Sequence, residues 1–215
     1  MIRVSCKALS GVLLFFLVGC AVKPVVDVSE RERQRIWADK QALLETIDAW
    51  HLKGRLAVNN AQDSWSASLI WRESTQDQEV RVVAPLGQGT AVVKREGHGM
   101  TQLKLSNGRV FFGESASDLL HAQLGWYLPV ESLVYWVRGM PDPDYASQWR
   151  LNELGQIDSL EQAGWQVEYK RYRFSDHYEM ELPSKLFLQR DDWRIKLVVQ
   201  DWQGYKNKHE GKHHH

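Results

Sequence analysis

The residue of this chain whose setting best fits a covalent reaction is Cys20. It ends the segment Leu17-Val18-Gly19-Cys20, which closes an apolar run from Ala8 to Val18, and Arg3 and Lys7 precede that run. A basic start, a short apolar stretch and small residues at the end are typical of a secretory signal peptide. The run is shorter than the roughly 20 apolar residues that a membrane-spanning helix needs. Residues 1–19 are therefore predicted to be a signal peptide that is removed on export.

The four residues that end in Cys20 resemble the lipobox of bacterial lipoproteins. The resemblance implies that Cys20 becomes the first mature residue, with a diacylglycerol on its thiol and a third acyl chain on its amine. Each buried methylene contributes about 0.8 kcal/mol, so such a group would anchor the chain firmly in a membrane. The alternative is an ordinary signal peptide with an incidental cysteine. Residues 20–29 are expected to be a lipidated tether. Ala21, directly after the cysteine, is compatible with a lipoprotein that is held in the outer membrane.

Other patterns in the sequence lack the context that catalysis or metal binding requires. Gly87-x-Gly89 is followed by no Lys-Ser pair, and Gly113–Ser117 lacks the final glycine of a nucleophile elbow. Asp191-Asp192 is better interpreted as a turn than as a catalytic pair. Most histidines are scattered, and His213–His215 end a polar tail, residues 203–215. We therefore expect no enzymatic activity, no cofactor and no bound metal.

Composition indicates one domain that is stabilised by its core. Both cysteines, Cys6 and Cys20, lie in or at the signal, so the exported body has no disulfide. Its ten tryptophans, seven tyrosines and six phenylalanines are ample for a core. Removal of Arg3 and Lys7 leaves 25 basic against 27 acidic residues, a net charge of −2. This balance argues against a nucleic-acid partner.

The first element of the domain is predicted to be a helix over about residues 30–48. Ser29 and Glu32 form a capping box, and Ile36, Leu43, Ile47 and Trp50 recur at roughly helical spacing. The polar face carries charges of both signs. We therefore expect this helix to pack on its own domain rather than on a membrane surface.

From Trp50 onward the apolar period changes to two, which indicates antiparallel strands joined by turns. Ser115 with Asp118 predicts a helix start within this pattern, and Pro129 starts a further helix that Gly139 ends. The fold class is thus mainly β (α+β): one strongly curved antiparallel sheet whose concave face helices fill or cover. The expected strands cover about residues 50–58, 65–71, 80–84, 90–95, 101–106, 109–113, 149–153, 156–161, 165–173, 179–190 and 193–200.

Three segments together resemble the LolB family of outer-membrane lipoprotein receptors. They are Trp50–Val58 with Trp65–Trp71, Ala84–Gly87 with Thr90, and Pro129–Leu133 with Trp136 and Gly139–Pro141. The resemblance covers residues 30–202. It implies a single-domain incomplete antiparallel β-barrel, with inserted helices covering a hydrophobic cavity for acyl chains. It also implies a monomer that accepts lipoproteins from the periplasmic carrier LolA and releases them, without a nucleotide, into the inner leaflet of the outer membrane.

Two sets of site residues follow from the resemblance and from strand parity. Leu86, between Pro85 and Gly87, is expected at an exposed hairpin tip that inserts into the membrane; otherwise it folds back over the barrel end. The second set shares the face of the sheet or helix that is expected to line the cavity, and the alternative for each member is plain core packing. It comprises Leu56, Trp71, Val80, Val82, Leu103, Leu105, Leu120, Leu133, Trp136, Leu182, Leu186 and Leu197.

Two other functions remain open at this point. An envelope scaffold lipoprotein would bind partner proteins through its surface and would use the interior only as core. An anchored hydrolase would need a nucleophile and a base, which the sequence does not indicate. Saturable binding of a fluorescent fatty-acid analogue would separate the receptor from the scaffold.

Overall fold

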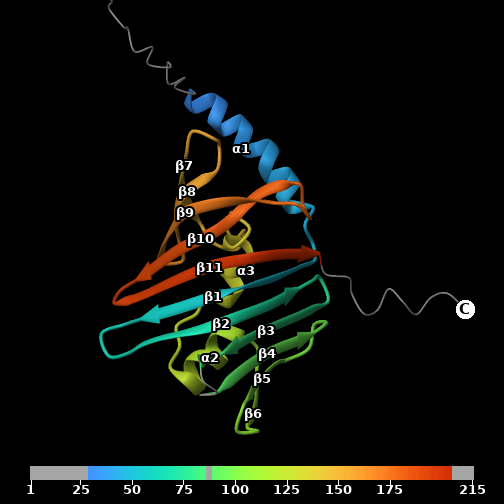
Figure 1. The fold of residues 1–215 in the computed structure, drawn as a ribbon, viewed down its shortest axis with the longest axis vertical. Coiled ribbons are helices and arrows are strands. Elements are labelled where there is room, and N and C mark those ends of the chain that lie inside the picture. The colour runs from blue at the N-terminus through green and yellow to red at the C-terminus, as the bar shows by residue number, and fades with distance from the viewer. Residues whose placement is uncertain (1–28, 86–88, 205–215) are drawn as a thin grey trace, which may run out of the picture.

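A computed structural model describes residues 29–85 and 89–204. The expectations for the signal peptide, Cys20 and its tether, for Leu86 and Gly87, and for the tail after residue 204 lie outside the described residues. The described chain forms one sheet of eleven antiparallel strands in the order β6-β5-β4-β3-β2-β1-β11-β10-β9-β8-β7. The sheet curls strongly but does not close, since β6 and β7 are its two free edges (Figure 1).

Each strand follows its neighbour through a short turn, apart from one long crossover that carries two helices. Because β1 pairs with the last strand, β11, the two halves of the chain form a continuous ladder. The predicted incomplete barrel is therefore confirmed. The strands are β1 (Trp50–Asn59), β2 (Ser64–Glu73), β3 (Asp77–Val83), β4 (Thr90–Glu96), β5 (Thr101–Leu105), β6 (Val110–Gly113), β7 (Ser147–Leu151), β8 (Ile157–Gln162), β9 (Trp165–Ser175), β10 (Met180–Arg190) and β11 (Trp193–Gly204).

Two irregularities accompany the bending of the sheet. The register of β1 against β11 shifts between Lys53 and Gly54, and that of β10 against β9 shifts after Pro183. At Gly54 a Cβ atom would lie 2.5 Å from the carbonyl oxygen of Val198, so only glycine permits this close approach. Such bulges increase the local twist and bend the strand that carries them.

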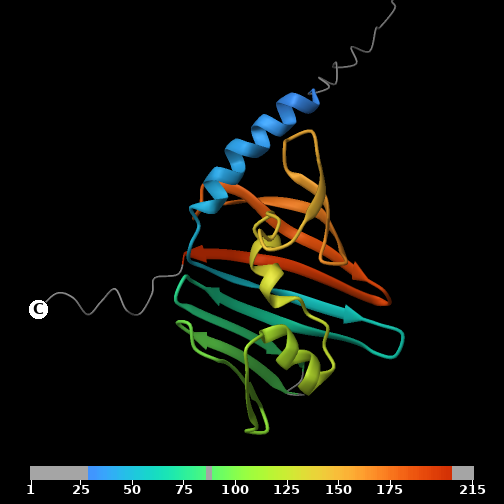
Figure 2. The same cartoon turned by 180° about the vertical axis from the view of Figure 1, so that it is seen from behind.

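Helix α1 (Glu30–Glu45) begins where the capping box predicted, because the Ser29 side chain accepts a hydrogen bond from the Glu32 amide. It lies along one end of the sheet, beside β7 to β10 (Figures 1 and 2). Of the expected apolar positions, Ile47 and Trp50 are buried, but Leu43 was wrong. Trp37 and Leu44 are the buried helical residues, whereas Leu43 is 58% exposed. The helix touches the domain along a narrow seam, and the spacing of the apolar residues alone does not show which of them meets it.

Helices α2 (Ala116–Leu124) and α3 (Val130–Trp136) occupy the concave side of the sheet (Figure 2). Ser115 caps α2 by accepting a hydrogen bond from the Asp118 amide, as predicted. Pro129 occupies the N-cap of α3, one position before its first turn, and Gly139 after the helix adopts φ of 85°. Within the described residues, no helix is both long enough and apolar enough to cross a membrane.

Candidate functional site

The concave face of the sheet presents one continuous apolar surface, built by cross-strand pairs. Leu56 of β1 lies opposite Leu197 of β11, which in turn lies opposite Leu186 of β10. Trp71 of β2 lies opposite Val80 of β3. All five side chains are at most 1% exposed. Strand parity alone therefore identified the inward face correctly on strands that are far apart in sequence.

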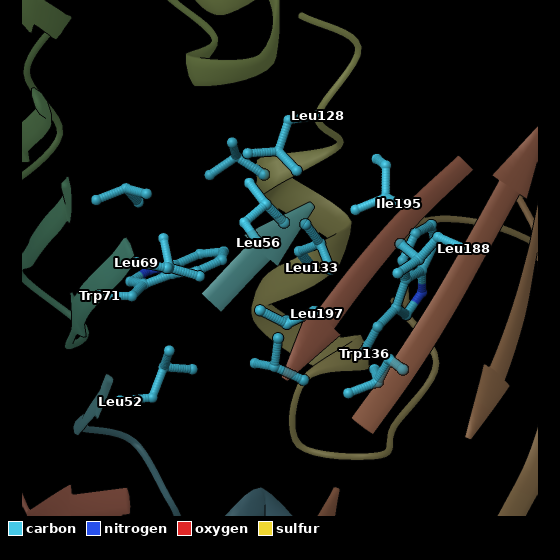
Figure 3. Packing of buried hydrophobic residues seen from close by; sticks show 14 of the residues in the cluster. Leu52, Leu56, Leu69, Trp71, Leu128, Leu133, Trp136, Leu188, Ile195 and Leu197 are labelled. Atoms are coloured by element: carbon cyan, nitrogen blue, oxygen red, sulfur yellow. The ribbon is translucent and has the colours of Figure 1, made fainter. Parts of the chain in front are cut away.

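Helix α3 lies against this surface and completes the interior. Figure 3 shows Leu133 and Trp136 of α3 pointing toward Leu56, Leu197 and Leu188 of the sheet. The Trp136 indole N–H donates to Gln162 Oε1 at 2.8 Å, and Tyr169 donates to the carbonyl oxygen of Trp136 at 3.0 Å. Trp136 is fully buried, so the bond to Gln162 orients the ring and the bond from Tyr169 satisfies the backbone carbonyl, which leaves neither polar group unpaired.

Trp71 is fixed in a similar way by a buried carboxylate that sequence reasoning did not single out. Glu73 Oε2 accepts hydrogen bonds from Trp71 Nε1 at 2.8 Å and from Gln78 Nε2 at 2.9 Å. Burial raises the pKa of Glu73 above its usual value, and the hydrogen bonds and the charges of Arg95 and Arg138 only partly oppose that rise. The signal that could have found Glu73 is a carboxylate at an inward-facing strand position.

Helices α2 and α3 are joined as a unit by Glu131. Its Oε1 accepts hydrogen bonds from the Ala116 amide at 2.7 Å, the Ser117 amide at 3.2 Å and the Ser115 hydroxyl at 3.1 Å. Ser117 also donates its hydroxyl to Glu131 Oε2 and accepts from the Val130 amide at 2.8 Å. A carboxylate at a helix N-terminus is favoured by the helix dipole and by the free N–H groups there. The two helices are thus expected to move together.

Arg138, just after α3, links the interior helix to the end of α1. Its Nη1 donates to the carbonyl oxygen of Ile47 at 2.8 Å and to that of Leu44 at 3.4 Å. Burial lowers the pKa of Arg138 from its usual value, and nearby Tyr135 and Glu73 oppose the shift. The guanidinium stays charged, as arginine does in proteins, and satisfies carbonyl groups at the end of α1.

The segment between α2 and α3 covers one end of the concave side with aromatic rings. Trp126 stacks on Trp65 of β2 with ring centroids 4.2 Å apart, and Tyr127 contacts Trp193 of β11 at 5.2 Å. Gly125 starts this segment with φ of 69°. These four rings are held by contacts between their faces and edges, and each is only partly buried or exposed.

A pocket of about 470 Å³ lies beside this segment, between α2, the start of α3 and the β8–β9 turn. Tyr127 and Trp165 contribute to its walls, and Leu128 lies both in the pocket lining and in the buried cluster (Figure 3). The pocket therefore borders the buried cluster at Leu128 and Trp165.

The twelve residues predicted to line a cavity are brought together in one cluster. Eleven of them are buried, and Leu105 is partly buried and packs against the rest. Because the cluster also contains Leu52, Leu69 and Val93, these residues belong with the predicted set although they were not named there. Burial places all of them inside the sheet, and their role toward an acyl chain stays a prediction.

The loop predicted to reach a membrane joins β3 to β4. Its base is closed by a hydrogen bond from the Ala84 amide to the Gly89 carbonyl oxygen at 3.0 Å, and Pro85 is exposed. Leu86 and Gly87 belong to residues 86–88, outside the described part of the chain. Among the described residues, no group of three or more His, Cys, Asp or Glu side chains could hold a metal ion.

The class of protein that these observations define is an incomplete antiparallel β-barrel with helices on its concave face. A solved domain from Vibrio parahaemolyticus, described as an outer membrane lipoprotein-sorting protein, shares the fold with a TM-score of 0.54 at 10% sequence identity. The alignment covers 82% of this chain and 94% of that domain.

Sequence comparison places the chain within this class. The family model "Outer membrane lipoprotein LolB" matches residues 48–202. The outer-membrane lipoprotein LolB of Stutzerimonas stutzeri (strain A1501) is 35% identical over 196 residues, which are 91% of this chain and 94% of the relative. LolB of Pseudomonas aeruginosa (strain LESB58) is 36% identical over 197 residues, with the same coverage. The chain belongs to the LolB family of outer-membrane lipoproteins, as the resemblance indicated.

Proposed function

We propose that this protein is a lipid-anchored receptor at the periplasmic face of the outer membrane. It accepts lipoproteins from a LolA-type carrier, holds their acyl chains against the concave face of its sheet, and inserts them into the inner leaflet. The supporting observation is an apolar interior that helices cover, instead of further strands. Helices held by side-chain contacts can move aside, whereas strands in a ladder would first lose backbone hydrogen bonds.

The energetics of the transfer need no nucleotide. Acyl chains in water carry a large hydrophobic penalty, so each carrier must offer them an apolar surface. Transfer proceeds if each acceptor binds the chains slightly more tightly than the donor, and about 1.4 kcal/mol gives a tenfold preference. The buried cluster around Leu56, Trp71 and Trp136 would supply the apolar surface in this protein.

The route into the interior is proposed to pass between the α2–α3 segment and the ends of β2 and β11. Displacing Trp126 and Tyr127 from Trp65 and Trp193 breaks ring contacts and no strand pairing. The adjoining pocket already reaches Leu128 of the cluster. Because Glu131 links α2 and α3, this displacement would carry both helices.

Anchoring and release are assigned to two further parts of the chain. Cys20 is proposed to carry the acyl groups that hold the protein in the membrane. Leu86, which lies in the sequence between β3 and β4, is proposed to form the tip of their loop and to enter the bilayer when a lipoprotein is released. The closed loop base and the exposed Pro85 are consistent with a projecting tip.

The proposal is tested by moving a labelled lipoprotein from loaded carrier to the lipidated protein reconstituted in vesicles. We expect the label to leave the soluble fraction and to become embedded in the vesicles. The Leu86→Glu variant should still take the lipoprotein from the carrier but should fail to deliver it, because a charged tip cannot enter hydrocarbon.

The matched control is Gln88→Glu, which adds the same charge to the same loop and keeps Leu86. It should deliver at close to the normal rate. Normal delivery by Leu86→Glu would refute the role of the tip. Failure of the unaltered protein to take label from the carrier would refute the receptor function as a whole.

A further inference from the structure

The convex face of the sheet carries a basic groove that the lipoprotein-binding interior does not explain. The groove has a volume of about 420 Å³ and crosses β3, β4 and β5. Its lining includes Arg81, Lys94 and Lys104, one from each strand, around Val92. Register places Val92 opposite both Arg81 and Lys104, so that the two cations lie on either side of this valine.

The charge of the groove is only partly neutralised. Glu79 accepts from Arg81 at 3.1 Å, from Lys94 at 3.0 Å and from Arg72 at 3.2 Å, so that one carboxylate serves three cations. Burial alone would raise the pKa of Glu79, but hydrogen bonds from Lys94 and Arg81 lower it overall, and the carboxylate stays charged. In the described part of the chain, Lys104 makes no ion pair. The groove thus keeps a net positive charge although the exported chain is slightly acidic.

Exposed apolar side chains continue the same face onto the edge strand β6. Val110 is 42% exposed and lies opposite Lys104, and Phe112 is 60% exposed and lies opposite Gln102. Phe111, between them, points inward and packs against the core. A surface that combines cations with exposed aromatic and aliphatic groups is typical of proteins that bind the interface of a membrane.

The position of the groove agrees with this partner. Arg81 and Lys94 are carried by the two strands that the 84–89 loop connects, and Arg81 lies four residues before Pro85. The acidic residues Asp77 and Glu96 lie at the other ends of these strands, away from the loop. The lining of the groove also includes Thr90, the first residue of β4 after the loop, so the groove extends to the part of the molecule that is proposed to contact the bilayer.

We propose that the convex face of β3 to β6 is a docking surface for anionic phospholipid headgroups, whose phosphates lie among Arg81, Lys94 and Lys104 while Val110 and Phe112 enter the interface. The inference rests on the proposed function, because it gives the protein a defined orientation on the membrane that receives its cargo. A basic side chain near an anionic bilayer contributes about a fivefold gain in association, and salt weakens it. Docking should hold the loop against the bilayer between rounds of delivery.

The test uses the lipidated protein reconstituted in vesicles, with one environment-sensitive dye on an introduced cysteine. The acylated Cys20 has no free thiol, and no other cysteine follows it in the chain, so the label is unique. Gln102→Cys places the dye in the groove, and Gln166→Cys places it on β9 in the other half of the sheet. Lipids that carry a spin label on the headgroup report which dye lies at the membrane.

In vesicles that contain phosphatidylglycerol, we expect strong quenching of the dye at residue 102 and little at residue 166. In pure phosphatidylcholine, or at high salt, quenching at residue 102 should fall. The triple variant Arg81→Gln, Lys94→Gln, Lys104→Gln should lower the ratio of docked to undocked protein by about tenfold or more. Lys104→Gln alone should give a smaller loss and leaves the ion pairs of Glu79 in place.

The matched control neutralises three exposed cations on β9, with Lys170→Gln, Arg171→Gln and Arg173→Gln, and should leave quenching at residue 102 unchanged. Near-ultraviolet circular dichroism confirms that each variant is folded. Equal quenching at both dye positions, or no effect of the groove variants, would overturn the inference. Shielding of residue 102 only when the carrier is added would also overturn it and would identify an acidic protein as the partner.

The same vesicles receive labelled lipoprotein from loaded carrier in a parallel measurement. Normal delivery without quenching at residue 102 would refute the docking surface and leave the proposed function intact. Quenching without any uptake of lipoprotein would refute the proposed function and support the docking surface as a separate property.

Discussion

Helices α1 and α3 differ sharply in how they are held by the same sheet. The seven residues of α3 lie within the concave face, and Val130, Leu133 and Trp136 are almost completely buried. The sixteen residues of α1 bury only Trp37 and Leu44. Trp136 donates its indole N–H to Gln162, whereas the buried Trp37 Nε1 has no hydrogen-bond partner among the described residues. The short helix belongs to the core, and the long one is attached to its rim.

This difference shows that helix length does not indicate importance for the fold. Helix α1 carries its own N-cap, Ser29, and good helix formers, so its local sequence favours a helix. The N-cap residue of α3, Pro129, makes no side-chain cap bond, and the helix depends on burial, on Gln162 and on its links to α2 through Glu131 and Ser117. Removing side chains from the two helices should therefore lower the unfolding free energy by unequal amounts.

The largest effect is expected from Trp136→Ala. Replacing a fully buried tryptophan leaves a cavity and removes a hydrogen bond, which costs about 3–5 kcal/mol of unfolding free energy. Trp37→Ala should cost clearly less, because its ring packs at the rim against Trp149 with centroids 6.4 Å apart. Urea denaturation of both variants measures the difference. Equal losses would show that the two helices are held alike.

The next effect concerns the caps of the helices. Glu131→Ala removes the acceptor for four backbone or hydroxyl donors at the start of α2, and we expect a loss of about 2 kcal/mol of unfolding free energy. Ser29→Ala at the N-cap of α1 should cost about 0.5–1 kcal/mol, since that end is exposed. Hydrogen exchange of the α2 and α1 amides measures each loss locally. A larger loss at Ser29 would reverse the ranking of the helices.

A smaller change in unfolding free energy is expected when Trp37 or Trp136 is replaced by phenylalanine. Trp37→Phe removes a buried N–H that finds no partner in residues 29–85 and 89–204, so the change in unfolding free energy should be within about 1 kcal/mol of neutral. Trp136→Phe removes a satisfied hydrogen bond and should cost about 1–2 kcal/mol more than that. The comparison is made by thermal unfolding of the pair. It fails if Trp37→Phe is the more damaging change.

The smallest effect is a pH dependence from Glu73, near the Arg138 link between the two helices. Because the folded protein raises the pKa of Glu73, burial of its charged form lowers stability. This penalty is absent below the unfolded pKa of about 4.3 and grows as the pH rises through the folded pKa. Glu73→Gln keeps one oxygen that can accept from both Trp71 and Gln78. Unfolding measured against pH should show the wild type losing stability relative to this variant in that window.

Much of the fold was predictable because the two faces of most strands differ in polarity. The alternation through Leu56, Trp71 and Val80 predicted both the strands and their inward side. Cap and turn residues such as Ser115 and Gly139 predicted where the α2 helix begins and where the chain turns after α3. The family resemblance implied an incomplete barrel, but the pairing of β1 with β11 was not predicted, because local patterns carry no information about strands about 140 residues apart.

The features that escaped prediction depend on contacts between distant parts of the chain. Which face of α1 is buried depends on where the helix meets the end of the sheet, and only the assembled sheet defines that position. Glu131 as a cap for another helix, and Gln162 as the partner of Trp136, join residues 15 and 26 positions apart. The basic groove arises from single cations on three strands, each of which is unremarkable in the linear sequence.

The free edges at β6 and β7 have a mechanical consequence. A closed barrel has a circumference fixed by the number and stagger of its strands. This sheet has no such constraint, because no backbone ladder joins its two edge strands, β6 and β7. Small changes of twist, shared among ten strand pairings, can widen or narrow the concave side of the sheet while every strand pairing stays intact. The width of the concave side can therefore adapt to bound groups of different size by elastic bending of the sheet, without unfolding any strand.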